Sequence, residues 1–220
     1  MSKYFFSNSV NGTISLTVFD QYINYVAKWY RTDEKYYHTI DHVRNMFKLF
    51  LMYEKQFDEE FKDDDVWYNA EDGKRNLFWS IAYHDAFYMP GFCMNEKFSA
   101  EIADEQLWKV CGIDRVAIKN IIISTVPGWK QIDNSLKKII HDLDWSGFLD
   151  YNVMLSNEKK ILTEAVEIGR YNKNVVIANQ IKFYKEFANV DMYLTKTFAK
   201  FNDCVKINLN RRIGELEKEK

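Results

Sequence analysis

Residues that break helices are scarce in this sequence of 220 residues. It contains 2 prolines and 8 glycines, and both residue types interrupt a helix when they lie in its interior. Alternation of apolar and polar residues is not sustained over several positions, so no segment is typical of a half-buried strand. The sequence therefore predicts long helices and an all-α fold class.

Cysteine is too rare and too scattered for a disulfide framework or a zinc ribbon. Cys93, Cys111 and Cys204 lie far apart, and no CxxC spacing occurs. Reduced thiols fit a cytoplasmic protein. The first residues, MSKYFFSNSV, lack the apolar run of a signal peptide, and no stretch approaches the roughly 20 apolar residues of a membrane span. We therefore expect a cytoplasmic protein without a membrane partner.

The sequence also lacks an excess of charge of either sign. Its formal net charge is -2, so no global basic excess indicates nucleic-acid binding through phosphate neutralisation. The hydrophobic fraction of 47% and the charged fraction of 28% are ordinary for a globular protein. This length suits one domain, and we expect residues 1–220 to form it.

Aromatic residues, in contrast, are abundant. Phe, Trp and Tyr make up 16% of the sequence. Large rings fill the gaps between packed helices, so a bulky core is the first interpretation. A pocket that stacks a nucleotide base is the alternative, and the sequence does not separate the two.

Helical periodicity recurs along most of the chain. Apolar residues follow helical spacing over residues 19–30 and again over 37–57, whereas the acidic segment 58–65 predicts an exposed loop. Residues 75–83 predict a short and strongly apolar helix. Further helices are expected over residues 95–111, 114–124, 135–149, 157–169, 174–187 and 197–220. Together these segments predict about eight or nine helices.

Each of the 4 histidines lies close to another histidine or to a carboxylate. His38 and His42 are four residues apart on a predicted helix, so they project from one face. His84 ends the apolar helix and precedes Asp85, while His141 begins the sequence HDLD. Imidazole and carboxylate together suit a divalent transition metal. Such pairs also arise by chance, and a buried histidine with a satisfied hydrogen bond is the alternative.

Segments spread over most of the chain resemble the predicted metal-dependent phosphohydrolases of the HD superfamily. They are KYYHTIDHV (35–43), WSIAYHDAFY (79–88), NEKFSAEIAD (95–104), HDLDWSGFL (141–149) and KINLNRRI (206–213). The first four are similar, in order, to the family patterns RxYHxxxH, FHDxxY, NExxSA and LDADLxxLG, and the last to the family's final helix. The resemblance implies a single-domain HD-fold helical bundle with its core over about residues 19–213.

The resemblance further implies that His42, His84, Asp85 and Asp144 bind a divalent metal ion. Two imidazoles and two carboxylates accept Mn, Fe, Co, Ni or Zn, and Mg less readily. One or two ions are expected.

One motif departs from the family pattern. The chain has His141-Asp142-Leu143-Asp144 where the family has Leu-Asp-Ala-Asp. Asp142 is therefore the alternative to Asp144 as the last ligand, and the extra His141 could recruit a second metal.

Catalytic roles follow from the same resemblance. The spacing YHxxxH is also similar to the distantly related cyclic-nucleotide phosphodiesterases, in which the first histidine is the general acid; this implies that His38 protonates the leaving oxygen. A structural hydrogen bond to a carboxylate is its alternative role. Asp85 or Asp144 would orient the nucleophile.

Lys35 replaces the family's usual Arg and would offer a point charge to phosphate; a solvated loop lysine is the alternative. Glu96 would accept a hydrogen bond from a ligand histidine or favour a helix N-terminus.

We therefore expect a hydrolase of phosphate esters, acting on a nucleotide or related small molecule. In this reading, metal-bound hydroxide attacks phosphorus. Two alternatives stay open from the sequence. The extra histidine His141 motivates an HD-type di-iron oxygenase, and a non-enzymatic nucleotide- or protein-binding module could also use the same scaffold.

Overall fold

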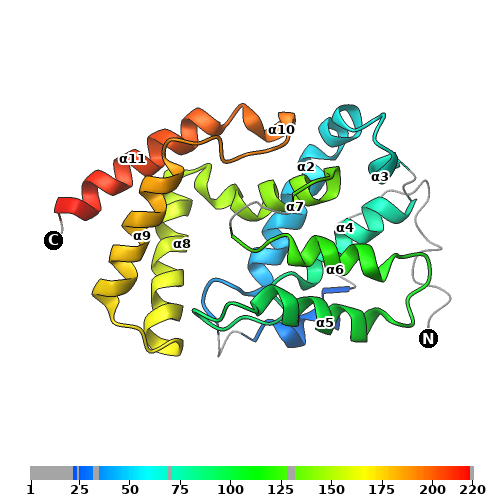
Figure 1. Cartoon of the computed structure of the whole chain (residues 1–220), viewed down its shortest axis with the longest axis horizontal. Helices are drawn as coiled ribbons and strands as arrows, with labels where there is room; N and C mark the ends of the chain where they lie inside the picture. The colour runs from blue at the N-terminus through cyan, green and yellow to red at the C-terminus, as the bar shows by residue number, and fades with distance from the viewer. Residues whose placement is uncertain (1–21, 24, 32–34, 69–70, 128–131, 219–220) are drawn as a thin grey trace.

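The computed structural model describes residues 22, 23, 25–31, 35–68, 71–127 and 132–218. All regular structure in these residues is helical, and no strand occurs among them, which confirms the all-α prediction for this part of the chain. No helix within it is both long and apolar enough to cross a bilayer. The elements, labelled in Figure 1, are η2 (Ala27–Trp29), α2 (Ile40–Glu60), α3 (Asp65–Tyr68), α4 (Glu71–Tyr83), α5 (Asn95–Leu107), α6 (Arg115–Ile123), α7 (Ser135–Asp144), η3 (Trp145–Phe148), α8 (Tyr151–Thr163), η4 (Glu164–Ile168), α9 (Lys173–Phe187), α10 (Lys196–Ala199) and α11 (Asn202–Lys218).

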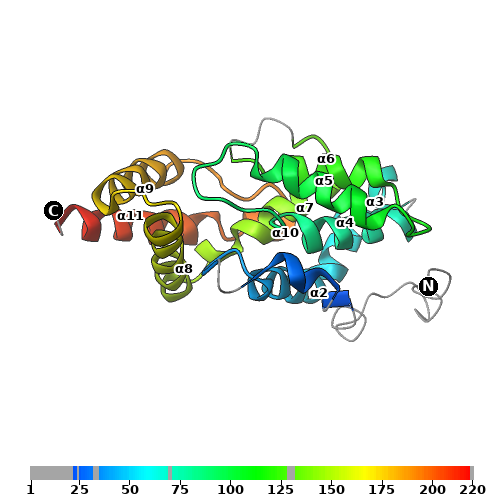
Figure 2. The same cartoon turned by 90° about the horizontal axis from the view of Figure 1, so that it is seen from below.

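Helix α4 is the centre of the larger group of helices. It contacts α2, α3, α5, α6 and α7, and it lies between α2 on one side and α5 and α6 on the other (Figure 2). Its second half is buried on every side, from Leu77 to Tyr83, as expected of a helix that is apolar all round. The residues that follow α4, His84 and Asp85, therefore emerge inside the molecule.

Aromatic rings fill the space between α2 and its neighbours. Phe50 and Phe57 of α2 both lie against Trp67, and Phe57 stacks on Phe198 of α10 with ring centroids 6.0 Å apart. These rings are buried. A bulky core thus accounts for these aromatic residues.

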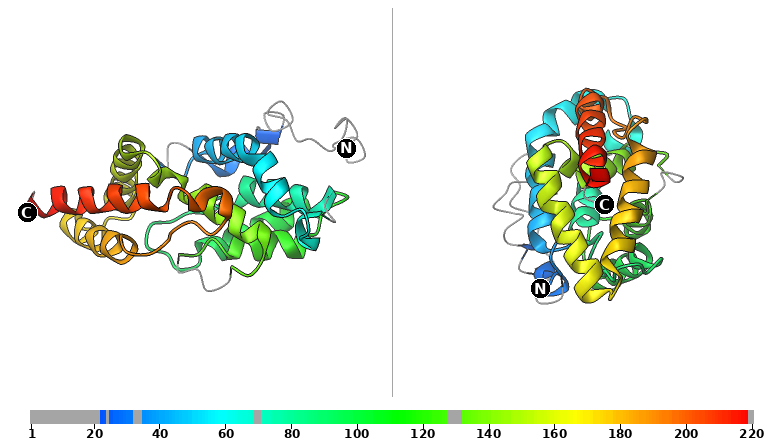
Figure 3. Two further views of the ribbon diagram at one scale, coloured as in Figure 1. Left: turned by 90° about the horizontal axis from the view of Figure 1, so that it is seen from above. Right: turned by 90° about the vertical axis from the view of Figure 1, so that its left-hand side faces the viewer.

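Helices α8, α9 and α11 form a second group beside the first (Figure 1), with α8 and α9 side by side (Figure 3). A buried ion pair joins two of them, because Arg212 Nη2 of α11 lies 2.6 Å from Glu158 Oε1 of α8. The π-helical turn η4 continues α8. This arrangement brings Glu164, the first residue of η4, against residues 36–38 of the first group.

Two helix boundaries differ from the prediction for identifiable reasons. Helix α2 extends to Glu60, so part of the acidic segment 58–65 is helical; Lys74 of α4 supplies a positive partner, 3.0 Å from Glu54 and 2.7 Å from Asp58. Helix α8 begins at Tyr151 rather than at residue 157, because Asp150 accepts a hydrogen bond from the N–H of Val153 and caps it. Of the helix predicted over residues 19–30, residues 19–21 and 24 lie outside the described part.

Candidate metal centre

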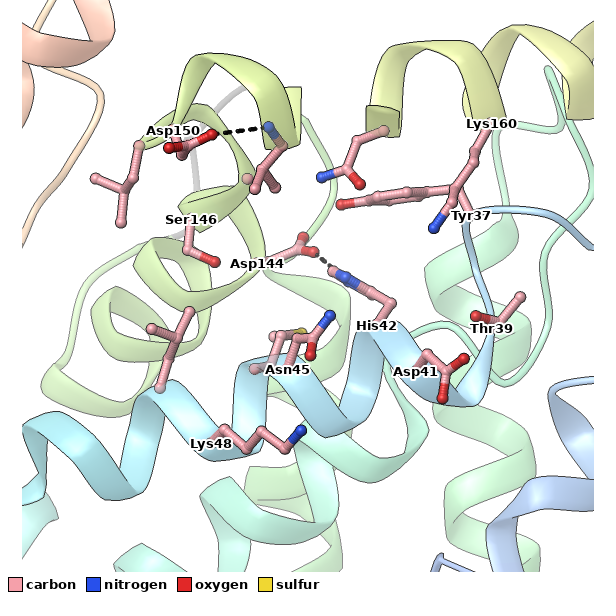
Figure 4. A pocket seen from close by; sticks show the side chains of 16 residues that line it. Tyr37, Thr39, Asp41, His42, Asn45, Lys48, Asp144, Ser146, Asp150 and Lys160 are labelled. Carbon is pink, nitrogen blue, oxygen red and sulfur yellow. Dashed lines mark hydrogen bonds and ion pairs between the residues drawn. The ribbon is translucent and has the colours of Figure 1, made fainter. Parts of the chain in front are cut away.

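Helix ends bring the four predicted metal ligands together. His42 lies in the first turn of α2, His84 and Asp85 directly follow α4, and Asp144 is the last residue of α7. One ligand atom of each residue lies within 4.8 Å of the others. Figure 4 shows His42 and Asp144 facing each other from α2 and α7. Residues 102 positions apart thus share one site.

Three distances between these atoms match neighbouring ligands of one ion, whereas His42 Nε2 to Asp85 Oδ2 and His84 Nε2 to Asp144 Oδ1 are longer, at 3.8 and 3.7 Å. His42 Nε2 lies 2.9 Å from Asp144 Oδ1, His84 Nε2 lies 3.0 Å from Asp85 Oδ2, and the two Nε2 atoms are 3.3 Å apart. Ligands held about 2.1 Å from one ion are about 3.0 Å apart at right angles and about 3.4 Å apart at tetrahedral angles. Two imidazole nitrogens and two carboxylate oxygens also suit a divalent transition metal. The group could therefore hold a metal ion.

A main-chain hydrogen bond orients His84 for this role. Its Nδ1 lies 2.9 Å from the carbonyl oxygen of Ile81. A carbonyl can only accept, so Nδ1 carries the proton and Nε2 is left for a metal. Burial works against the charged imidazole, but the charges of Asp85 and Asp144 outweigh burial and raise the pKa of His84 well above its usual range.

The pKa values of the two carboxyl groups, Asp85 and Asp144, are lowered by the neighbouring histidines. Burial favours their neutral forms, yet His84 and His38 lower the pKa of Asp85, and hydrogen bonds to His42 and His84 lower the pKa of Asp144. Without metal, the site is therefore a group of mutually stabilised charges. A metal must displace a proton from it.

His38 lies beside the centre, paired with Glu164. Its Nδ1 is 2.6 Å from Glu164 Oε2, and Glu164 is fully buried. Burial raises the pKa of that carboxyl, but the hydrogen bonds from the side chain and main chain of His38 outweigh burial and lower it. An ionised carboxylate can only accept, so Nδ1 of His38 is the donor. Nε2 is then the atom left to exchange a proton.

Sequence reasoning did not find Glu164. It is one of several glutamates near the end of α8, and no nearby motif marks it. Only the packing of η4 against residues 36–38 gives it a role. Tyr88, whose position does match the FHDxxY pattern, stacks on the ring of His38 with centroids 3.4 Å apart.

Two cavities meet at the centre. The aromatic cavity, about 450 Å³ in volume, is lined by His38, Asp85 and Glu96 together with rings of η3 and α9 and amides of α9. The polar cavity, about 460 Å³ in volume, lies on the side of α2 and α8 and is lined by His42 and by mostly polar side chains. Tyr37 and Asp144 line both cavities. A ligand in either cavity can therefore reach the candidate metal ligands.

The ammonium group of Lys35 lies on main-chain carbonyls. It donates to the carbonyl oxygens of Trp29, Asp85 and Ala86 at 3.1, 2.9 and 3.4 Å, and it lies over the ring of Tyr30. Lys35 is buried. This placement favours a role in positioning the backbone of Asp85, and contact with phosphate stays a prediction.

Asp142 and His141 lie outside the group of ligands. Asp142 accepts hydrogen bonds from the N–H of Leu194 and from both the N–H and the hydroxyl of Thr195. His141 Nδ1 lies 3.0 Å from Asp142 Oδ1, and its ring stacks on Trp145. The geometry therefore favours Asp144 as the last ligand, and it places the extra histidine in a structural contact.

The NExxSA motif holds the loop that follows the His-Asp pair. The side-chain amide of Asn95 forms hydrogen bonds with the N–H and the carbonyl oxygen of Met89. The hydroxyl of Ser99 likewise bonds the N–H and the carbonyl oxygen of Phe87. Glu96 lies between them in the sequence and lines the aromatic cavity. Burial, and then the charges of Asp85 and Asp144, raise the pKa of Glu96.

Comparisons with known proteins do not assign the chain to a family. No family model matches the chain, and no curated protein or solved structure is significantly similar to it. The function must therefore be argued from the site.

Proposed function

We propose that this protein is a metal-dependent hydrolase of phosphate esters with an HD-type fold. The observation that carries the proposal is the group of two histidines and two aspartates beside a histidine–glutamate pair, next to an aromatic cavity that His38, Asp85 and Asp144 line. A metal centre next to a group that can transfer a proton is what hydrolysis of an ester of phosphoric acid requires. The ordered resemblance of the sequence motifs supports the same reaction.

His42, His84, Asp85 and Asp144 would hold the ion. When bound, a divalent ion supplies a hydroxide nucleophile near neutral pH and polarises a phosphoryl oxygen. The chain supplies orientation: the carbonyl of Ile81 fixes the tautomer of His84.

His38 is the proposed general acid. Glu164 accepts from its Nδ1 and so fixes the ring orientation, while Tyr88 stacks on the ring and limits its rotation. His38 and Asp85 both line the aromatic cavity, so a substrate in that cavity can contact both residues. Proton transfer from a positioned side chain contributes about 10²–10⁴-fold to such reactions.

The aromatic cavity supports a substrate with a flat ring. Trp145, Phe148 and Phe183 line it together with the amides of Asn179 and Gln180. Nucleobases stack on such rings and form hydrogen bonds with amides. Gln180 Nε2 donates to the hydroxyl of Tyr184 at 2.8 Å, which fixes the orientation of that amide. A nucleotide is therefore the proposed substrate class.

Metal content and phosphate release test the proposal together. We expect about one or two manganese ions per chain in the wild type, metal-dependent phosphate release from a panel of nucleotides, and loss of both in Asp85→Ala. The matched control is Asp133→Ala, because Asp133 is exposed, pairs with Lys137 and lines neither cavity. A wild-type protein that binds no manganese would contradict the proposal and favour a binding module. Tightly bound iron without phosphate release would favour the oxygenase.

A further inference from the structure

Two lysines line the polar cavity from different helices. Lys48 projects from α2 and Lys160 from α8, so the side chains reach the cavity from two walls (Figure 4). Both are exposed, and neither has an ion-pair partner within the part of the chain that the structure describes. Their positive charges are available to a ligand.

The two exposed carboxylates beside them are already engaged. Asp41 Oδ1 lies 2.9 Å from Arg44 Nη1. Asp150 caps α8 by accepting from the N–H of Val153 at 2.9 Å. Their partners offset part of their charge, so the two lysines remain the side chains of the cavity suited to binding an anion.

Uncharged hydrogen-bond donors also line the polar cavity. Asn157 and Ser146 line the cavity, and the amide of Asn157 lies so close to Gly147 that an added Cβ there would be 2.6 Å from its Nδ2. Glycine at this position therefore allows the amide to lie against the turn after α7. Amide and hydroxyl donors beside lysines are typical of phosphate sites.

The polar cavity is continuous with the centre through shared residues. Tyr37 and Asp144 line it and also line the aromatic cavity. The ring of Tyr37 lies beside the ring of His42, with centroids 4.9 Å apart, so the residue that borders both cavities is also in contact with the candidate metal centre. A ligand with two anionic groups could place one at the centre and the other between the lysines.

We propose that the polar cavity binds a second phosphate of the substrate, held by Lys48 and Lys160. Naming this ligand as part of the substrate rests on the proposed function, whereas anion binding in the cavity does not. The substrate class becomes an organic phosphate that carries a further phosphate group, such as a nucleoside diphosphate. A nucleoside monophosphate would leave this cavity without its ligand.

Calorimetric titration with inorganic pyrophosphate tests the anion site directly in chelator-treated protein, in which the metal cannot bind the probe. The double variant Lys48→Gln/Lys160→Gln is compared with the control Lys55→Gln/Lys159→Gln, whose lysines lie on the same helices but do not line the cavity. We expect affinity to fall roughly tenfold in the first variant and to stay at the wild-type value in the control. Equal pyrophosphate affinity in the two double variants would overturn the proposal.

Kinetics provide a second measurement that separates the two proposals. With manganese, kcat/KM for a nucleoside diphosphate should fall roughly tenfold in Lys48→Gln/Lys160→Gln, while kcat/KM for p-nitrophenyl phosphate, which has one phosphate, should not change. An equal fall for both substrates would contradict a role specific to the second phosphate. Absence of any turnover in the wild type would count against the proposed function alone, and the pyrophosphate titration would still decide the anion site.

Discussion

Glu164 holds His38 in two ways at once. One carboxylate oxygen accepts from the ring Nδ1 at 2.6 Å, and the other accepts from the N–H groups of Tyr36, Tyr37 and His38. A single buried side chain thus fixes both the imidazole and the backbone that carries it. Glu164 begins a π-helical turn, a local irregularity that is frequent at functional sites.

The substitution Glu164→Gln should separate the two effects. The amide oxygen can still accept from the backbone, but the amide nitrogen cannot accept a hydrogen bond from Nδ1 of His38. We expect kcat to fall about 10²-fold, with metal content and helical content unchanged. Glu167→Gln is the control, because Glu167 is exposed and bonds the hydroxyl of Tyr36. If both variants keep wild-type kcat and its pH profile, the contact between His38 and Glu164 is structural only.

Substitutions at Asp142 and Asp144 should have opposite consequences. Asp144→Asn is expected to lower the metal content, because it removes a charged ligand atom. Asp142→Ala should keep the metal but lower the free energy of unfolding by about 1–3 kcal/mol, because donors of Leu194 and Thr195 lose their acceptor in a buried position. Elemental analysis and urea unfolding measure the two quantities. Metal loss in Asp142→Ala, with Asp144→Asn still loaded, would reverse the assignment.

Asp142 and Asp144 also show what the sequence does not specify. Residues 142 and 144 are two positions apart on α7, so they point to different sides of the helix. Which of them faces the centre depends on how α7 packs, and no local pattern specifies that. The candidate ligands His42, His84 and Asp85 were predicted from the resemblance of their motifs, and the apolar helix that leads into His84-Asp85 favoured that pair.

Groups that act through distant packing could not be predicted. Glu164, Lys48 and Lys160 belong to helical segments rich in charge, where each resembles an ordinary exposed residue. Their proximity to the centre arises only when η4 and α8 pack beside α2 and α7. Similarly, the rings that line the aromatic cavity have the same helical spacing as core residues. Composition alone therefore predicted the fold class but not the shape of the site.

Metal affinity should rise as the pH rises above 6.5. The pKa of His84 is raised above 6.5 in the metal-free protein, so a metal must displace its proton. Titrations in buffers of different ionisation enthalpy would measure the protons released. Affinity that does not change with pH, with no proton release, would contradict the protonated state of His84.

The stability of the metal-free protein should depend on pH at both ends. The raised pKa of His84 stabilises the fold below 6.5, and this contribution is lost as the pH rises through the folded pKa. The lowered pKa values of Asp85 and Asp144 contribute above 3.8 and lose that contribution as the pH falls through their folded values. Stability should therefore be greatest between these limits. Thermal unfolding across pH, with and without chelator, would measure it; a metal-free profile that is flat over this range would argue against the charge pairs.

Lys35→Met discriminates between backbone positioning and phosphate binding. The side chain keeps most of its length but loses the ammonium group that bonds the carbonyls of Trp29, Asp85 and Ala86. If positioning is its role, the free energy of unfolding should fall by about 1–3 kcal/mol, because buried acceptors lose their donor, and metal should bind less tightly as Asp85 shifts. If Lys35 instead binds phosphate, KM should rise with little change in stability or metal affinity. Lys28→Met, at an exposed lysine that bonds Gln106, is the control. Compared with it, we expect Lys35→Met to unfold at lower urea concentration and to bind metal less tightly, with a similar KM.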